Sequence, residues 1–180
     1  MEKIAVMGAG SWGTALAILL AKKGHHVTLW CYLESEKEQL ESVRENLNYL
    51  PGVPIPQNII ITNDYKEAIV NNEIIVIAIP SKFLRSNMEQ FSPYLTPRHL
   101  VVNVSKGLEN HTLLRMSQVI EETAPQCPVA VLMGPSHAEE VARDIPTACV
   151  SSSRSQKIAE RVQDLFMTPT FRVYTNPDLI

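Results

Sequence analysis

The stretch Lys3-Ile-Ala-Val-Met-Gly-Ala-Gly-Ser-Trp-Gly-Thr-Ala15 decides the fold of this chain. It contains an apolar strand, a turn with the spacing G-x-G-x-x-G, and an apolar-faced helix that stops at Gly24. Glycines at this spacing occur by chance in many chains, but the strand before them and the helix after them make the pattern specific. The stretch therefore predicts the first unit of a doubly wound α/β sheet that binds a dinucleotide.

Each glycine of the turn has its own predicted role. Gly8 permits the tight turn, Gly10 lets the backbone approach a pyrophosphate, and Gly13 lets the helix pack close to the strand. The free N–H groups at the helix N-terminus then receive the phosphates. The alternative is a glycine-rich turn that binds nothing, which the flanking strand and helix make the weaker interpretation.

Composition and charge exclude several classes of function. The chain has 180 residues, 45% hydrophobic and 19% charged, which suits one soluble domain with a substantial core. The net charge of −3 gives no electrostatic case for nucleic acid or an anionic membrane. No apolar run approaches the roughly 18 residues of a membrane span. The first strand starts at the N-terminus, so we expect no signal peptide and a cytoplasmic protein.

The cysteines and histidines do not form a metal or disulfide pattern. Cys31, Cys127 and Cys149 lie far apart and include no C-x-x-C pair, which favours reduced, buried thiols over a structural disulfide. His and Cys never recur at ligand spacing, so no metal site is predicted. No G-x-S-x-G elbow is present either.

Strand and helix patterns alternate along the chain, which predicts a mainly parallel sheet with helices on both faces. We expect residues 1–180 to form a single Rossmann domain with six parallel strands in the order 3-2-1-4-5-6 and one or two extra strands. The expected strands are residues 3–7, 26–30, 59–61, 73–79, 99–104, 129–133, 147–151 and 171–174. Besides the first helix and a short one after residue 137, the expected helices are 34–46, 65–70, 84–90, 112–122 and 155–166.

Prolines modify this pattern at two places. Pro51, Pro54 and Pro56 are expected to exclude regular structure from residues 48–57. Pro177 is typical of the first turn of a new helix, so the chain looks cut at Ile180.

Four segments are predicted to follow strands at the carboxyl edge of the sheet, where open α/β sheets bind their ligands. They are Gly8–Gly13, Pro80–Phe83, Ser105–Gly107 and Gly134–Ala138. Together they form a plausible floor for a dinucleotide and a small anionic substrate.

Lys106 is the residue best placed for chemistry. It directly follows a strand expected to be buried, and Gly107 allows a tight turn beneath it. A lysine held beside a nicotinamide ring could bind a substrate oxygen or exchange a proton. The alternative is a solvated lysine in a surface turn, and position alone leaves both open.

The loop after the sixth strand also has two interpretations. Gly134 and Ser136 offer backbone and hydroxyl hydrogen bonds to a ligand, whereas Ser136 could equally be the N-cap of the next helix. His137 has no adjacent acid or nucleophile, so we expect it to pack.

The choice between NAD and NADP is poorly marked. An acidic residue at the end of the second strand favours NAD, and a nearby arginine favours NADP. The stretch Cys31-Tyr-Leu-Glu34 shows neither device clearly. Tyr32 could lie against the adenosine and Glu34 is placed too far along, so NAD and NADP both stay open.

Five motifs together resemble the N-terminal domain of the NAD(P)-dependent glycerol-3-phosphate dehydrogenases of bacterial type. They occur in the family's order and span nearly the whole chain, and the last two are the most specific. The motifs are Gly8–Ala15, Asn48–Gly52, Ile79–Ser81, Ser105–Glu109 and Gly134–Val141.

The resemblance implies roles for single residues. The dinucleotide would contact Ser11, Trp12, Tyr32 and Ala138, with Phe83 as a weaker candidate. The glycerol-phosphate site would be lined by Lys106, Gly134 and Ser136, and Lys106 would touch both ligands and polarise the substrate oxygen. The family interconverts dihydroxyacetone phosphate and glycerol 3-phosphate by hydride transfer, which supplies the backbone of phospholipids.

The resemblance also implies parts beyond Ile180. Family members continue into a helical domain that supplies a second active-site lysine for proton transfer and an arginine for the substrate phosphate. We therefore expect this chain to bind dinucleotide and to turn over slowly or not at all, and a full-length parent to be a homo-oligomer. The alternatives are another two-domain dehydrogenase, of β-hydroxyacid type, and a non-catalytic dinucleotide-sensing module.

Overall fold

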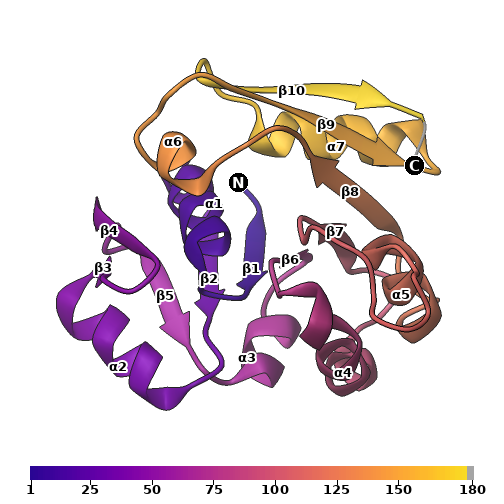
Figure 1. Cartoon of the computed structure of the whole chain (residues 1–180), viewed down its shortest axis with the longest axis horizontal. Helices are drawn as coiled ribbons and strands as arrows, with labels where there is room; N and C mark the ends of the chain where they lie inside the picture. Colours follow the sequence, from indigo (N-terminus) through magenta and orange to yellow (C-terminus); the bar gives the residue numbers. More distant parts are fainter. Residues whose placement is uncertain (178–180) are drawn as a thin grey trace.

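The computed structural model describes residues 1–177, and a twisted sheet runs through its centre (Figure 1). The strands of this sheet are β1 (Lys3–Met7), β2 (His26–Trp30), β5 (Ile59–Thr62), β6 (Ile74–Ile77), β7 (Leu100–Asn103), β8 (Val129–Met133), β9 (Thr147–Ser153) and β10 (Phe171–Asn176). Their spatial order is β10-β9-β8-β7-β6-β1-β2-β5.

The predicted topology is confirmed. From β5 to β8 neighbouring strands are all parallel, and in chain order they follow the pattern 3-2-1-4-5-6. Two extra strands extend the sheet beyond β8. The first, β9, is antiparallel to β8, and β10 is parallel to β9.

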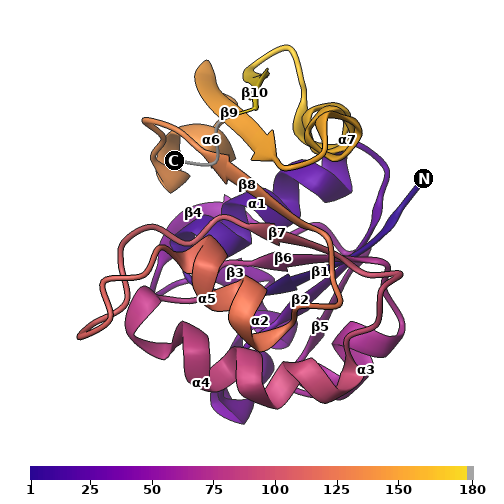
Figure 2. The ribbon, with the colours of Figure 1, turned by 90° about the vertical axis from the view of Figure 1, so that its right-hand side faces the viewer.

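Helices cover both faces of the sheet (Figure 2). On one face lie α1 (Ser11–Lys22), α6 (Ala138–Ala142) and α7 (Gln156–Phe166). The opposite face carries α3 (Tyr65–Val70), α4 (Ser81–Phe91), the short 3₁₀ helix η1 (Ser92–Tyr94) and α5 (Met116–Thr123). The remaining helix, α2 (Glu34–Val43), packs beside β5.

Strand β6 shows how one run of apolar residues supports both layers. Ile74 and Val76 belong to the core under α1, whereas Ile75 and Ile77 belong to the core under α4. Successive side chains of a strand point to opposite faces, so a strand covered on both sides needs an unbroken apolar sequence. The residue pattern of 73–79 therefore predicts the central position of this strand correctly.

One expectation about residues 48–57 is wrong. The structure places β4 (Leu50–Pro54) there, paired antiparallel with β3 (Glu45–Asn46) in a separate two-stranded sheet. Prolines are tolerated at sheet edges because a strand with a partner on one side only does not need every N–H group. Pro51 and Pro54 therefore fit into this hairpin.

Three helix boundaries differ from expectation by more than one residue. Helix α2 ends at Val43 rather than at residue 46, because Arg44 adopts a left-handed conformation with φ of 53°. Helix α5 begins only at Met116, because His111 and Leu113 also have positive φ. Helix α4 begins earlier, directly after Pro80. The helix expected from Pro177 lies outside the described residues.

The three cysteines are free and buried, as expected. Burial raises the pKa of the Cys31 thiol to about 12 and that of Cys127 to about 11. Both thiols are therefore protonated at neutral pH, which makes them unreactive. No helix within residues 1–177 is long and apolar enough to cross a membrane, and no cluster of metal-ligating side chains occurs in the same range.

Candidate functional site

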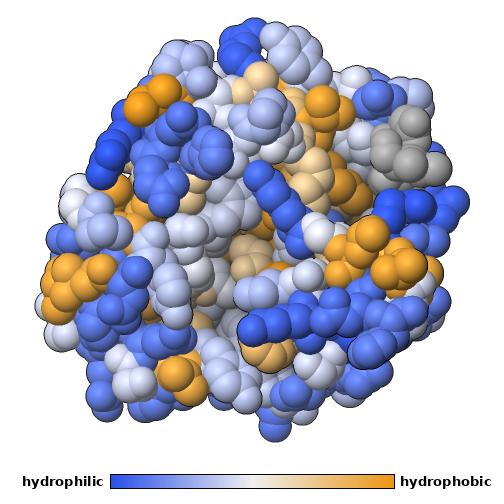
Figure 3. Space-filling view, viewed as in Figure 1, coloured by the Kyte–Doolittle hydropathy of each residue, from blue (hydrophilic) through white to orange (hydrophobic). Residues whose placement is uncertain are grey.

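A cavity of about 850 Å³ lies at the carboxyl ends of the parallel strands. Its position corresponds to the hollow near the middle of the face in Figure 3. All four segments expected at this edge contribute to its lining, and the main lining groups are Gly8–Gly13, Ala78–Pro80, Phe83, Val104–Lys106 and Ser136–Glu139. The volume is within the range of ligand-binding pockets.

The glycine-rich turn is packed too tightly for side chains at two of its positions. Gly8 has a φ of +124°, and a Cβ there would lie 2.5 Å from the carbonyl oxygen of Ala78. A Cβ on Gly13 would lie 1.9 Å from the carbonyl oxygen of Gly8. The predicted roles of these glycines in the tight turn and in close helix packing fit this geometry.

Gly10 faces open space instead. Its φ is −71°, and no heavy atom lies within 4 Å of the position that a Cβ would take. It precedes α1, whose N-terminus has neither a side-chain cap nor an acidic residue in its first turn. The positive end of the α1 dipole therefore lies at the cavity, and the first turn of the helix contains no acidic residue to neutralise it. This arrangement favours binding of phosphate.

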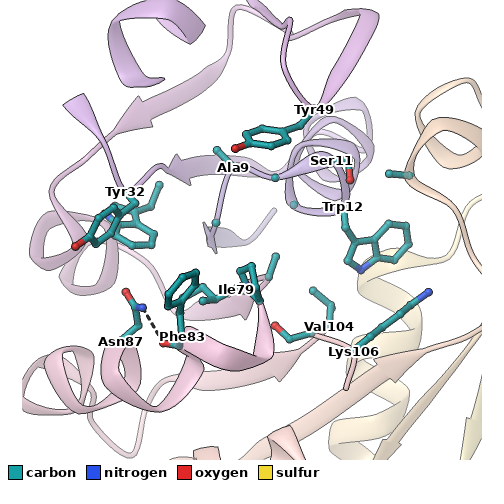
Figure 4. A pocket seen from close by; sticks show the side chains of 18 of the residues that line it. Ala9, Ser11, Trp12, Tyr32, Tyr49, Ile79, Phe83, Asn87, Val104 and Lys106 are labelled. Carbon is teal, nitrogen blue, oxygen red and sulfur yellow. Dashed lines mark hydrogen bonds between the residues drawn. The ribbon is translucent and has the colours of Figure 1, made fainter. Parts of the chain in front are cut away.

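Lys106 lies at one end of the cavity, on the same side as Trp12 of α1 (Figure 4). Its Nζ donates a hydrogen bond to the carbonyl oxygen of Ser136 at 3.1 Å and lies 5.9 Å from the ring centre of Trp12. Gly107, with a φ of +105°, forms the turn beneath it. The lysine is exposed, and it is one of the residues that line the cavity.

An ion-pair network fixes the loop that follows Lys106. Arg85 on α4 contacts both carboxylate oxygens of Glu109, at 2.7 and 2.9 Å. The same guanidinium binds Glu122 at 2.7 Å, and Thr112 donates its hydroxyl to Glu109. The hydrogen bonds from Arg85, followed by the one from Thr112, lower the pKa of Glu109 to about 2.

This network predicts a pH-dependent contribution to stability. A carboxyl whose pKa is lower in the folded state stabilises the fold above its unfolded pKa of about 4.3. That contribution is lost as the pH falls through the folded value of about 2. Glu109→Gln is therefore expected to be less stable than the wild type at pH 7, with a difference that shrinks between about pH 4.5 and pH 2. Urea unfolding at a series of pH values measures this.

A control variant separates this ion pair from a general effect of charge. Glu89→Gln removes an exposed carboxyl from α4, outside the Arg85 network. The prediction is contradicted if the loss in free energy of unfolding of Glu109→Gln stays constant down to pH 2. It is also contradicted if Glu89→Gln shows the same pH-dependent loss.

The end of the cavity next to β2 is aromatic and carries an acid. In Figure 4, Tyr32, Phe83 and Asn87 lie at the end opposite Lys106. Tyr32 packs edge-on against Trp30 at 6.2 Å between ring centres and is 70% exposed, so its outer surface is free to contact a ligand. Glu36, in the first turn of α2, also lines this cavity.

Sequence reasoning missed Glu36 and Tyr49 as lining residues. Glu34, the acid considered from the sequence, instead binds Asn63 and Lys37. Glu36 lies two positions further on and lines the cavity because α2 begins only a short turn, residues 31–33, after β2 ends. Tyr49 is part of the Asn48–Gly52 motif, which was the available signal for it.

The loop after β8 is divided between the cavity and the core. Ser136, His137 and Ala138 line the cavity, but Gly134 does not. A Cβ on Gly134 would lie 2.5 Å from the carbonyl oxygen of Ala148, so this glycine lets the loop pass over β9. Its predicted contact with the substrate stays a prediction.

Two alternatives for this loop are wrong. The N-cap of α6 is His137 and not Ser136, whose hydroxyl donates to the carbonyl oxygen of Gly134 at 3.3 Å. His137 does not pack in the core either. Its side chain is exposed and lines the cavity, because His137 has an extended backbone and directly precedes α6.

Comparison with known proteins identifies the family of this chain. A family model described as "NAD-dependent glycerol-3-phosphate dehydrogenase N-terminus" matches residues 3–159. The chain belongs to this family. Curated glycerol-3-phosphate dehydrogenases [NAD(P)+] from Agathobacter rectalis and Bacillus subtilis are 48% and 44% identical to it. Both alignments cover 100% of this chain but only 54% and 53% of the relative.

Solved structures give the same result. A glycerol-3-phosphate dehydrogenase from Coxiella burnetii superposes with a TM-score of 0.93 at 32% identity and covers 99% of this chain and 55% of its own. A ketopantoate reductase from Ralstonia eutropha has a TM-score of 0.73 at 18% identity, a likeness of fold alone. The chain thus spans about half the length of the dehydrogenases that it matches.

Proposed function

We propose that residues 1–180 form the NAD(P)H-binding domain of an enzyme that reduces dihydroxyacetone phosphate to glycerol 3-phosphate for phospholipid synthesis. One observation carries the proposal: the glycine-rich turn and Lys106 face the same cavity from β1 and β7. A dinucleotide bound with its pyrophosphate at the start of α1 brings its nicotinamide toward Lys106. The names of the relatives support the choice of substrate.

The residues of the cavity suit distinct parts of this reaction. When bound, the nicotinamide supplies or accepts the hydride. The cationic Nζ of Lys106 binds the substrate carbonyl oxygen and stabilises the negative charge that develops there. Its bond to the Ser136 carbonyl holds the amine in the cavity. The start of α1, with Ser11 and Trp12, and the loop residue Ala138 bind the dinucleotide, and a lysine beyond Ile180 completes the proton transfer.

Two further proposals concern the setting of the enzyme. The reduced, buried cysteines favour a cytoplasmic location. The family resemblance favours a homo-oligomer for the full-length parent.

The purified chain is expected to bind NADH and to reduce dihydroxyacetone phosphate slowly or not at all. Hydride transfer requires both reactants in near-attack geometry, and the groups expected beyond Ile180 are needed to hold the phosphate. Calorimetric titration with NADH and a continuous assay of NADH absorbance measure the two parts. Rapid turnover by the chain alone contradicts the need for a second domain.

The same pair of measurements tests the alternatives. Failure to bind either NADH or NADPH removes support for the dinucleotide site. In a full-length form, preference for a carboxylate substrate indicates a dehydrogenase of β-hydroxyacid type. Tight NADH binding without turnover in the full-length form indicates a sensing module.

We further propose that the site prefers NAD(H) to NADP(H). Among the described residues that line the cavity, the acidic or basic side chains besides His137 are Glu36, Glu139 and Lys106. Lys106 lies at the end of the cavity away from Tyr32 (Figure 4). Glu36 lines the cavity from the first turn of α2, the helix that follows β2, and the adenosine ribose binds beyond the end of β2 in this fold. Helix α2 as a whole has four glutamates and one lysine. This charge suits a ribose hydroxyl and repels a 2′-phosphate.

A further inference from the structure

One buried side chain joins the β3–β4 hairpin to the glycine-rich turn. Asn46 is 2% exposed, and its Nδ2 donates hydrogen bonds to the carbonyl oxygen of Ala9 at 2.8 Å and to Oγ1 of Thr14 at 2.9 Å. Its Oδ1 accepts a hydrogen bond from the backbone N–H of Tyr49 at 3.1 Å. The amide thus contacts the turn, the first helix and a residue of the cavity wall.

The partners leave only one orientation for this amide. The carbonyl of Ala9 can only accept a hydrogen bond, and the N–H of Tyr49 can only donate one. A reversed amide would place its oxygen against the oxygen of Ala9 and its NH₂ group against an N–H. The contacts with Ala9 and Tyr49 together therefore require a donor and an acceptor on separate atoms, which an amide has and a carboxylate lacks.

The bond to Ala9 fixes the peptide that links Ala9 to Gly10. In a trans peptide the N–H points opposite to the C=O, so a carbonyl held by Asn46 turns the N–H of Gly10 away from Asn46. The flanking residues Gly8 and Gly10 have no Cβ to restrict this peptide. A tertiary hydrogen bond from a buried side chain supplies the restriction that the glycines lack.

We propose that Asn46 is a positioning residue for dinucleotide binding. It holds the Ala9–Gly10 peptide so that the N–H of Gly10 is available to the pyrophosphate, and it fixes Tyr49 at the cavity wall. The inference rests on the dinucleotide site proposed above. Binding is stronger when the turn is already ordered, because the entropy of ordering is not lost on association.

The chain offers a matched control in Asn72. This asparagine is 6% exposed, and its Nδ2 donates to the carbonyl oxygen of Ala68 at 2.7 Å and to Oγ1 of Thr28 at 3.3 Å. It is also buried and hydrogen-bonded, but neither of its partners belongs to the glycine-rich turn or to the start of α1. Asn46→Ala and Asn72→Ala therefore both leave buried partners unsatisfied, and only Asn46→Ala releases the turn.

Three readouts test the proposal: the unfolding temperature, the Kd for NADH and ADP, and amide hydrogen exchange of residues 8–14 in the ligand-free protein. Both variants are expected to lose unfolding temperature. Only Asn46→Ala is expected to raise the Kd, about tenfold or more and by the same factor for NADH and ADP, because both carry the pyrophosphate. Only this variant is expected to speed exchange in the turn.

Asn46→Asp provides a second variant if the alanine variant does not fold. It has the same shape and keeps the acceptor for the N–H of Tyr49, but its ionised carboxylate has no donor for the Ala9 carbonyl. Unchanged exchange in residues 8–14, or equal increases in Kd for the Asn46 and Asn72 variants, overturns the proposal. Absence of NADH and ADP binding by the wild type overturns the proposed function instead, and hydrogen exchange still decides whether Asn46 orders the turn.

Discussion

Gly13→Ala is expected to destabilise the chain by about 3 kcal/mol or more and to abolish detectable NADH binding. The added Cβ would lie 1.9 Å from the carbonyl oxygen of Gly8 and 3.1 Å from Cβ of Ala78. The first obstacle is backbone, so the start of α1 must move away from β1. For a domain of this size the change corresponds to a loss of about 10 °C in unfolding temperature.

Gly10→Ala is the informative partner of this variant. Its backbone φ of −71° suits alanine, and the site of the new methyl group is empty. Stability is therefore expected to change by less than about 1 kcal/mol. The methyl group occupies the path of the pyrophosphate, so the Kd for NADH is expected to rise about tenfold or more. Thermal unfolding and calorimetry separate the two effects.

The pair also shows what would contradict the assignment of the turn. Wild-type affinity in Gly10→Ala would mean that the phosphates do not approach the backbone at this point. A Gly13→Ala protein with unchanged stability would mean that α1 is not held as closely as the structure shows.

NADH is expected to bind about 10- to 100-fold more tightly than NADPH. A 2′-phosphate would carry close to two negative charges into the end of the cavity that Glu36 lines. At an effective dielectric constant of about 20, two unit charges about 4 Å apart interact by about 4 kcal/mol. Because the end of the cavity is open to solvent and salt, screening reduces this repulsion, and only the remainder separates the two affinities. Glu36→Gln is expected to reduce the ratio of the Kd for NADPH to the Kd for NADH. Glu36→Arg is expected to bring this ratio below one, so that NADPH binds more tightly. Calorimetric titrations at two salt concentrations measure both ratios.

Two control variants test whether the effect belongs to Glu36. Glu41→Gln makes the same change of charge on the exposed part of α2 and is expected to leave the ratio within about twofold, because salt screens distant charges. Lys82 lies over the Phe83 ring at 4.5 Å from its centre and is the nearby cation to remove. NADPH binding that equals or exceeds NADH binding contradicts the preference, and loss of that binding in Lys82→Ala would assign it to this lysine.

The positions of the glycines and of Lys106 could be predicted from the sequence because each depends on its own short segment. An apolar strand followed by glycines and a helix has few other solutions, and the order of the elements then limits the sheet topology. The resemblance to a family favours a role for Lys106 in the active site over a solvated lysine in a surface turn. In the structure Lys106 lines the cavity together with the glycine-rich turn.

Other features of the site could not be predicted because they depend on pairs of distant residues. Asn46 meets Ala9 across 37 positions of the sequence, and no local period encodes such a contact. The prolines of the hairpin suggest a loop when each is considered alone, but an edge strand accepts them. Gly134 resembles a ligand-binding glycine, and only the structure shows that β9 approaches it too closely for a Cβ.

By itself, the sequence determined the doubly wound sheet, the glycine-rich turn and the edge of the sheet at which the cavity lies. These features follow from local periodicity, because strands and helices bury their apolar side chains at fixed spacings. Only the tertiary structure decided which acid of α2 lines the cavity, which side chain is hydrogen-bonded to the glycine-rich turn and which glycine packs against β9. Those outcomes depend on distances between separate elements, which exist only after the layers have packed together.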